Sequence, residues 1–242
     1  MKEPERRIGS IAGIAYGGTL LVALILITPP FLGGPPDTLD PSNAEARVRL
    51  IAGLSATNIA LLRIGFPLEF LNVPLLIVAF VALYRGLAQG KRFFALVALT
   101  SAVSSAAFLL IGHFQRFLVL DLGQRYGAAD AVHKAGLGAV AVLGENLTQS
   151  ADMAFNVLLG TGLVFFALAM RSSSFPRWLR IWTWVAAGFS LASALLSAID
   201  WRLGFVSLPA LVVFAGWTLA LGFVLRRLAP PGDRDDLEAR VR

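Results

Sequence analysis

The sequence predicts an all-α protein: a polytopic bundle of six transmembrane helices with both termini in the cytoplasm. Hydrophobic residues make up 57% of the 242 residues and charged residues 15%, which lies outside the usual composition of soluble domains. Six apolar runs reach the roughly 20 residues that a spanning helix needs. They cover residues 8–28, 59–84, 93–114, 153–170, 178–199 and 205–225. We therefore expect a single domain over 1–227, followed by a charged cytoplasmic tail over 228–242.

The basic residues predict the orientation of this bundle. They gather before the first run, in every second turn and after the last run, at Lys2, Arg6, Arg7, Arg85, Lys91, Arg92, Arg171, Arg177, Arg180, Arg226 and Arg227. With six crossings, all of these clusters fall on one side, and the side rich in lysine and arginine is normally cytoplasmic. The formal net charge of +6 is thus explained by topology, and we expect no nucleic-acid partner.

The residue inventory excludes several kinds of chemistry. The chain has no cysteine, so disulfides, thiolate metal sites and dithiol redox chemistry are ruled out. It has two histidines, and His133 falls outside the apolar runs, which argues against haem held between facing helices. The signatures of intramembrane proteases, a phosphate-binding loop and a dinucleotide fingerprint are missing. We expect no cofactor, no metal and no catalytic residue, and the pattern points away from an enzyme.

The runs differ in what they carry besides apolar residues. The first follows a charged start and is too long for a signal-peptide core, so it is predicted to remain as an anchor. The third and fifth carry stripes of alanine, serine and glycine, which let helices approach closely in lipid. Between the third and fourth runs lies the longest predicted external segment, residues 115–150. Its part 128–143 is mildly apolar, and the pattern leaves open whether it is an interfacial helix or a re-entrant one.

The second run is the most unusual, because it combines an apolar span with Arg63, Glu69, Asn72 and two prolines, Pro67 and Pro74. Each proline removes one helical hydrogen bond and should bend the helix. Ionisable groups within a membrane are costly and are functional candidates by default. Glu69, near the middle of the run, is the leading candidate, and its alternative is a structural acid satisfied by another helix.

Other polar residues lie at the outer ends of the runs. We expect an outward-opening cavity with Glu69 deepest and the others at its mouth, as a ligand-binding or ion-coupling site. The full candidate set is Glu69, Asn72, Arg63, His113, Asp152, Asn156 and Asp200. Alternatively, an ion pair between Arg63 and Asp152 or Asp200 would give the same arrangement of residues a structural role instead of a binding role.

Three functions remain open. The favoured one is an accessory or scaffold subunit that binds a lipid, another membrane protein or a second copy of itself through its helix faces. The alternative is a small-molecule transporter or binder that uses the Glu69 cavity, since transporters place their sites near broken helices. The third is an intramembrane enzyme, which needs a second group within hydrogen-bond reach of Glu69; His113 is the only plausible base.

Two segments resemble a known family. The turn ALYRGL (82–87) and the segment RSSSFPRWLRIW (171–182) are similar to a bacterial membrane family known as domain of unknown function 4386. The resemblance covers roughly residues 7–227 and implies six membrane helices in the bacterial cytoplasmic (inner) membrane. Members often carry an acidic residue midway along the second helix, which Glu69 would match, whereas Pro67 and Pro74 are less typical. It implies no activity.

Overall fold

The computed structural model describes residues 3–28, 44–87, 91–200 and 207–228, and within these ranges the regular structure is entirely helical. The helices are α1 (Glu3–Ile27), α3 (Ala44–Ala52), α4 (Ala56–Leu87), α5 (Arg92–Tyr126), α6 (Ala131–Ala169), the short 3₁₀ helix η2 (Met170–Ser172), α7 (Arg177–Ile199) and α8 (Ser207–Arg227). All the α-helices except α3 are long and apolar enough to cross a membrane. The predicted all-α bundle with six long apolar helices is confirmed. The predicted tail lies outside the described residues, apart from Leu228.

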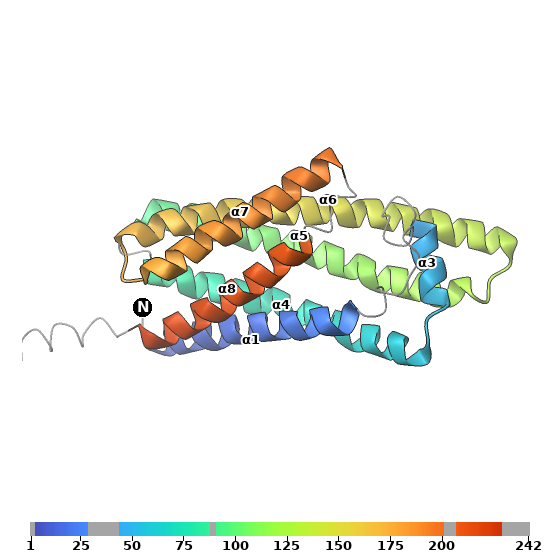
Figure 1. Ribbon diagram of the computed structural model, residues 1–242, viewed down its shortest axis with the longest axis horizontal. Helices are drawn as coiled ribbons and strands as arrows, with labels where there is room; N and C mark the ends of the chain where they lie inside the picture. The colour runs from blue at the N-terminus through green and yellow to red at the C-terminus, as the bar shows by residue number, and fades with distance from the viewer. Residues whose placement is uncertain (1–2, 29–43, 88–90, 201–206, 229–242) are drawn as a thin grey trace, which may run out of the picture.

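The six long helices form a closed ring in chain order (Figure 1). Each packs on its two neighbours in the sequence, and α8 closes the ring against α1, while α3 lies across α5 and α6. The end of the bundle that carries Arg85, Arg92, Arg171, Arg177 and Arg226 is called the basic end here. The opposite end, which α3 covers, is called the α3 end. This ring places the inward faces of α4, α5 and α6 side by side.

Small residues let these helices approach one another. A Cβ atom added to Gly162 of α6 would lie 3.0 Å from the carbonyl oxygen of Ala98 on α5. Ala98, Ser105 and Gly112 of the predicted α5 stripe are all buried. Such close contact is the usual basis of helix association in lipid, where apolar burial alone does not drive helices together.

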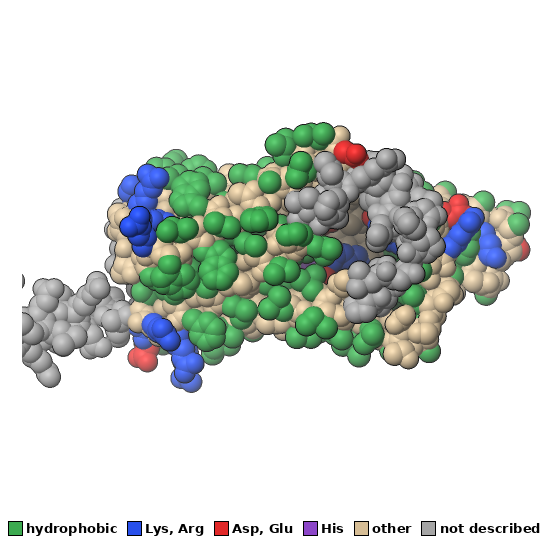
Figure 2. Space-filling model, viewed as in Figure 1, with side chains coloured by type: hydrophobic (Ala, Val, Ile, Leu, Met, Phe, Trp, Pro, Cys, Tyr) green, Lys and Arg blue, Asp and Glu red, His purple; other side chains and the backbone are tan. Residues whose placement is uncertain are grey.

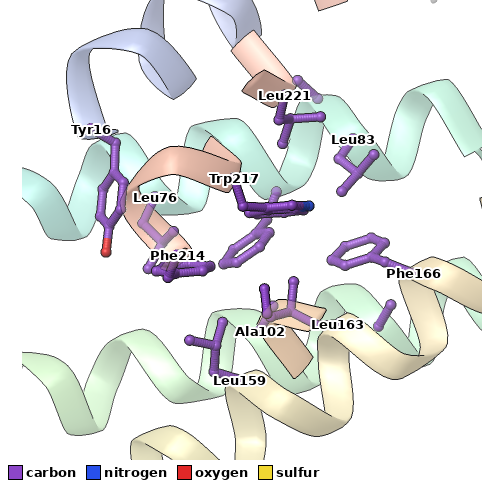
Figure 3. Packing of buried hydrophobic residues seen from close by; sticks show 14 of the residues in the cluster. Tyr16, Leu76, Leu83, Ala102, Leu159, Leu163, Phe166, Phe214, Trp217 and Leu221 are labelled. Carbon is purple, nitrogen blue, oxygen red and sulfur yellow. The ribbon is translucent and has the colours of Figure 1, made fainter. Parts of the chain in front are cut away.

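An aromatic layer lies inside the bundle, on α4 and α6 close to the basic end (Figure 3). Phe80 stacks on Phe166 with ring centroids 5.7 Å apart, and Phe214 stacks on Trp217 at 5.6 Å. Phe80 also contacts Phe214 and Trp217, and Tyr16 meets Phe214 edge to face. Because these rings come from α1, α4, α6 and α8, they fill the ring of helices across most of its width.

The outer surface of the helices is apolar. Figure 2 shows hydrophobic side chains along the length of the molecule's face, with Lys and Arg at its two ends and in a hollow past α8. Ile11, Ile25, Leu71, Leu195 and Val212 are among many large apolar residues that are more than half exposed. A soluble monomer rarely leaves so much contiguous apolar surface in water. The chain is therefore a multi-pass membrane protein whose helices contact lipid.

Two helices extend further than their apolar runs. With 35 and 39 residues, α5 and α6 are about 52 and 58 Å long, well beyond the roughly 30 Å of hydrocarbon. Both extend past the other helices at the α3 end (Figure 1). Most of the predicted external segment 115–150 is thus helical. Its part 128–143 is neither interfacial nor re-entrant, because from Ala131 on it is the first part of α6, running antiparallel to α5.

Helix α3 packs against the extended parts of α5 and α6 and stabilises them. Val48 and Ile51 are buried against Val119 and Leu122 of α5. The Tyr126 hydroxyl donates to Glu45 Oε1 at 2.9 Å, and Arg49 donates to the same carboxylate at 2.7 Å. These hydrogen bonds, that from Tyr126 foremost, hold the pKa of Glu45 below its ordinary value because they stabilise the ionised form.

Candidate functional site

The centre of the candidate site is an ion pair between α4 and α5. Arg116 Nη1 donates to both carboxylate oxygens of Glu69 at 2.6 Å. The Glu69 side chain is 5% exposed and that of Arg116 is 32% exposed. Glu69 lies 16 residues from Arg85, about 24 Å along the helix, which places it close to the hydrocarbon boundary at the α3 end. The carboxylate is therefore paired rather than isolated in the membrane.

His113, one turn before Arg116, lies beside this pair. Its Nδ1 atom is 3.4 Å from Glu69 Oε2, and its ring packs on Phe70 with centroids 5.7 Å apart. The side chain is 5% exposed, and apart from this long contact of Nδ1 with Glu69 neither ring nitrogen has a hydrogen-bond partner among the described residues. Buried polar atoms are nearly always hydrogen-bonded, so an exception calls for an explanation such as a bound molecule.

Asp152 and Asn156 approach from α6. A Cβ atom added to Gly112 would lie 3.1 Å from Asp152 Oδ1, so this carboxylate lies directly over the glycine. Asp152 is near enough to act electrostatically on both Arg116 and His113. Asn156 Nδ2 donates to the main-chain oxygen of Asp152 at 2.9 Å and so belongs to the same face of α6 without touching the ion pair.

A second ion pair adjoins the first on the side of α3. Arg47 of α3 donates to Glu145 Oε1 of α6 at 2.5 Å, and the Glu145 side chain is 7% exposed. Glu145 also acts electrostatically on Arg116. We call Arg47, Glu69, His113, Arg116, Glu145 and Asp152 the polar cluster.

Asn72 extends the cluster towards α1 and the bundle interior. It lies one turn from Glu69 on the buried face of α4 and is 1% exposed. The Thr19 hydroxyl of α1 is hydrogen-bonded to Asn72 Oδ1, whereas Asn72 Nδ2 is buried without a partner in the described part of the chain. Beyond Asn72 in the direction of the basic end, the aromatic layer begins.

Two of the predicted site residues lie elsewhere. Arg63 is exposed and donates to Gln124 Oε1 of α5 at 3.2 Å, so its expected pairing with Asp152 or Asp200 does not occur. Asp200 is the C-cap of α7, a helix that packs on α6 and α8. The structure thus brings together Glu69, Asn72, His113, Asp152 and Asn156, and leaves Arg63 and Asp200 outside the cluster.

Sequence reasoning missed Arg116, Glu145 and Arg47, which it left in segments outside the spans. One signal was available. Gly112 and Arg116 are four residues apart, as are Thr148 and Asp152, while Glu145 and Thr148 are three apart, the spacings that share a helix face. These faces become visible only if both helices are extended past their apolar runs.

Figure 2 shows a hollow in the surface past the end of α8, with Lys or Arg side chains at its base. In the described ranges no three histidine or acidic residues are placed to hold a metal ion. The arrangement is suited to receiving a small polar group, because unpartnered buried atoms lie next to charges that Arg116 and Arg47 only partly balance.

One family model matches the chain over residues 15–225, from α1 to α8. The chain belongs to the DUF4386 family. Its description, domain of unknown function, assigns no activity. The DUF4386 match confirms the resemblance seen in the sequence and includes every residue of the polar cluster. No curated protein and no solved structure matches this DUF4386 chain.

Proposed function

We propose that this membrane protein binds a small polar solute, which enters from the α3 end and is held at the polar cluster. The observation that carries the proposal is His113, a buried side chain whose Nε2 atom lacks a partner and whose Nδ1 atom makes only a long contact with Glu69. Leaving buried polar atoms without partners costs about 1–3 kcal/mol each. A solute that supplies those hydrogen bonds would recover that free energy on binding.

The direction of entry follows from the basic end. Lysine- and arginine-rich turns are normally cytoplasmic, so the α3 end faces outward and the solute comes from outside. We place the protein in a bacterial cytoplasmic membrane on the same reasoning. The aromatic layer around Phe80 and Trp217 lies between the cluster and the basic end. Binding is therefore the activity of this conformation, and transport would require these rings to separate.

A second candidate, an accessory subunit, is favoured by a different feature. An apolar groove of about 430 Å³ runs between α5, α6 and α7, lined by Phe108, Met153, Val157 and Leu191 among others. It faces lipid, where a helix of another membrane protein or an acyl chain would pack. The polar cluster is not needed for such a role, and this separates the two candidates.

Native mass spectrometry after mild solubilisation tests the proposal. We expect a small bound mass on the wild-type protein that is reduced in His113→Gln. His133→Gln is the matched control, because His133 is exposed at the start of α6, and it should retain the mass.

The alternative outcomes are distinct. A stoichiometric second polypeptide, retained in His113→Gln, would establish the accessory role instead. A protein without any bound mass in all three forms, also after incubation with extract of the source cells, would contradict solute binding.

A further inference from the structure

Resting on the proposed function, we infer that the solute is a small monovalent cation, a protonated amine, with Asp152 as its counter-ion and a ring nitrogen of His113 as an acceptor. Three features of the polar cluster lead to this class: its charge balance, its unused hydrogen-bonding groups and the approach of Asp152 to Gly112 beside His113.

The charges of the cluster do not balance. In the described part of the chain it contains three carboxylates, Glu69, Glu145 and Asp152, and two guanidinium groups, Arg47 and Arg116. When all three carboxylates are ionised, they outnumber the two guanidinium groups by one negative charge. An uncompensated charge near the hydrocarbon boundary is costly, so a bound cation would stabilise this charged form of the site.

Asp152 is the carboxylate that the missing positive charge would pair with. Glu69 is paired with Arg116 at 2.6 Å and Glu145 with Arg47 at 2.5 Å. Within the described ranges Asp152 has no basic side chain at ion-pair distance, and Arg116, its nearest source of positive charge, is engaged by Glu69. A cation beside Asp152 would complete a third pair without breaking the other two.

The unused hydrogen-bonding groups of His113 and Asp152 are acceptors, so a ligand that binds both must be a hydrogen-bond donor. Neutral histidine offers one nitrogen as an acceptor, and a carboxylate accepts through both oxygens. An ammonium group has three N–H donors and no acceptor, so one amine can serve His113 and Asp152 together. The side chain of His113 is about nineteen-twentieths buried, and its Nε2 atom has no partner in the described part of the chain, which is an observation separate from the charge of the acidic residues.

Gly112 brings Asp152 close to His113. It lies on α5 next to His113, and a Cβ atom added to it would lie 3.1 Å from Asp152 Oδ1. Because glycine has no Cβ atom, the Asp152 carboxylate of α6 can approach the α5 backbone beside His113.

The test compares three probes of equal size and different charge: ethanolamine as the cation, glycolate as the anion and ethylene glycol as the neutral form. Affinity is measured by titration calorimetry on the full chain in lipid nanodiscs. Of the three probes, we expect only ethanolamine to bind. Its affinity for Asp152→Asn should be about tenfold or more weaker than for the wild type, because a hydrogen bond to a charged group is lost. Asp121→Asn removes an exposed carboxylate of α5 and should bind like the wild type.

Several outcomes would overturn the inference. Unchanged ethanolamine binding by Asp152→Asn would exclude the assigned counter-ion. Binding of glycolate or ethylene glycol instead would contradict the charge class yet leave solute binding at the cluster intact. If none of the three probes binds while native mass spectrometry finds a His113-dependent mass, the assignment of the solute as a cation is wrong and the proposed solute binding stands. If that mass is also missing, both the cation assignment and the proposed function are contradicted.

Discussion

At the scale of single residues, Arg116 decides how Glu69 is tolerated. A carboxylate in the membrane needs a partner, and Arg116 supplies a short, charge-assisted pair from the neighbouring helix. Such a pair contributes little net stability compared with apolar side chains of the same shape, but breaking it leaves one buried charge alone. The pair therefore keeps both charges compensated where α4 packs on α5.

A comparison of Glu69→Gln with the double variant Glu69→Gln/Arg116→Gln separates the cost of leaving Arg116 unpaired from the net contribution of the ion pair to stability. We expect the single change to destabilise the protein by about 3 kcal/mol, the low end for a broken buried pair, since Arg116 is partly exposed. The double change should recover most of this loss because no charge is left unpaired. Thermal unfolding in detergent measures both, and equal destabilisation of the two variants would contradict the pairing.

At the scale of helices, close packing of small residues sets the neighbours in the ring. Gly17 of α1 lies so near α8 that an added Cβ would be 2.7 Å from the carbonyl oxygen of Ala215. Gly18, the next residue, has nothing within 4 Å of an added Cβ. The α1–α8 contact closes the ring and so holds Thr19 beside Asn72.

Alanine at these two glycines gives a matched comparison. Gly17→Ala should destabilise the protein by about 1–3 kcal/mol, because the backbone carbonyl cannot move aside easily. Gly18→Ala should be neutral or stabilising by up to about 1 kcal/mol, since alanine favours helices. The midpoint of thermal unfolding in lipid or detergent checks both; a Gly17→Ala protein as stable as the wild type would show that α1 and α8 pack less tightly.

At the scale of the whole molecule, charge and length differ between the two ends. The basic end is compact and rich in arginine, while the α3 end carries the extended α5–α6 pair with α3 packed against it. The polar cluster lies between the aromatic layer and this extension. Orientation in the membrane therefore decides from which compartment the cluster is reached.

Single cysteines report that orientation, because the chain has none of its own. Gly136 is exposed in α6 at the α3 end, and Ser174 is exposed in the turn between η2 and α7 at the basic end. We expect Gly136→Cys to react with a membrane-impermeant maleimide in intact cells, and Ser174→Cys only after the membrane is opened. The reverse pattern would place the cluster on the cytoplasmic side.

Much of this could be predicted from the sequence, since hydropathy and charge are properties of consecutive residues. The all-α class, the six long apolar helices and the family follow from apolar runs and turn motifs. Glu69, Asn72, His113, Asp152 and Asn156 were chosen because polar groups at membrane depth are conspicuous. The orientation and the single-domain extent of 1–227 remain predictions.

Only the tertiary structure decided which of these residues meet. The cluster depends on the rotation of α4, α5 and α6 about their axes, and on α5 and α6 continuing as helices past the hydrocarbon. Hydropathy loses its signal at that boundary, because a polar helix and a polar loop are equally acceptable in water. Arg116, Glu145 and Arg47 lie beyond that point, so their pairing with residues on other helices could not be read along the chain.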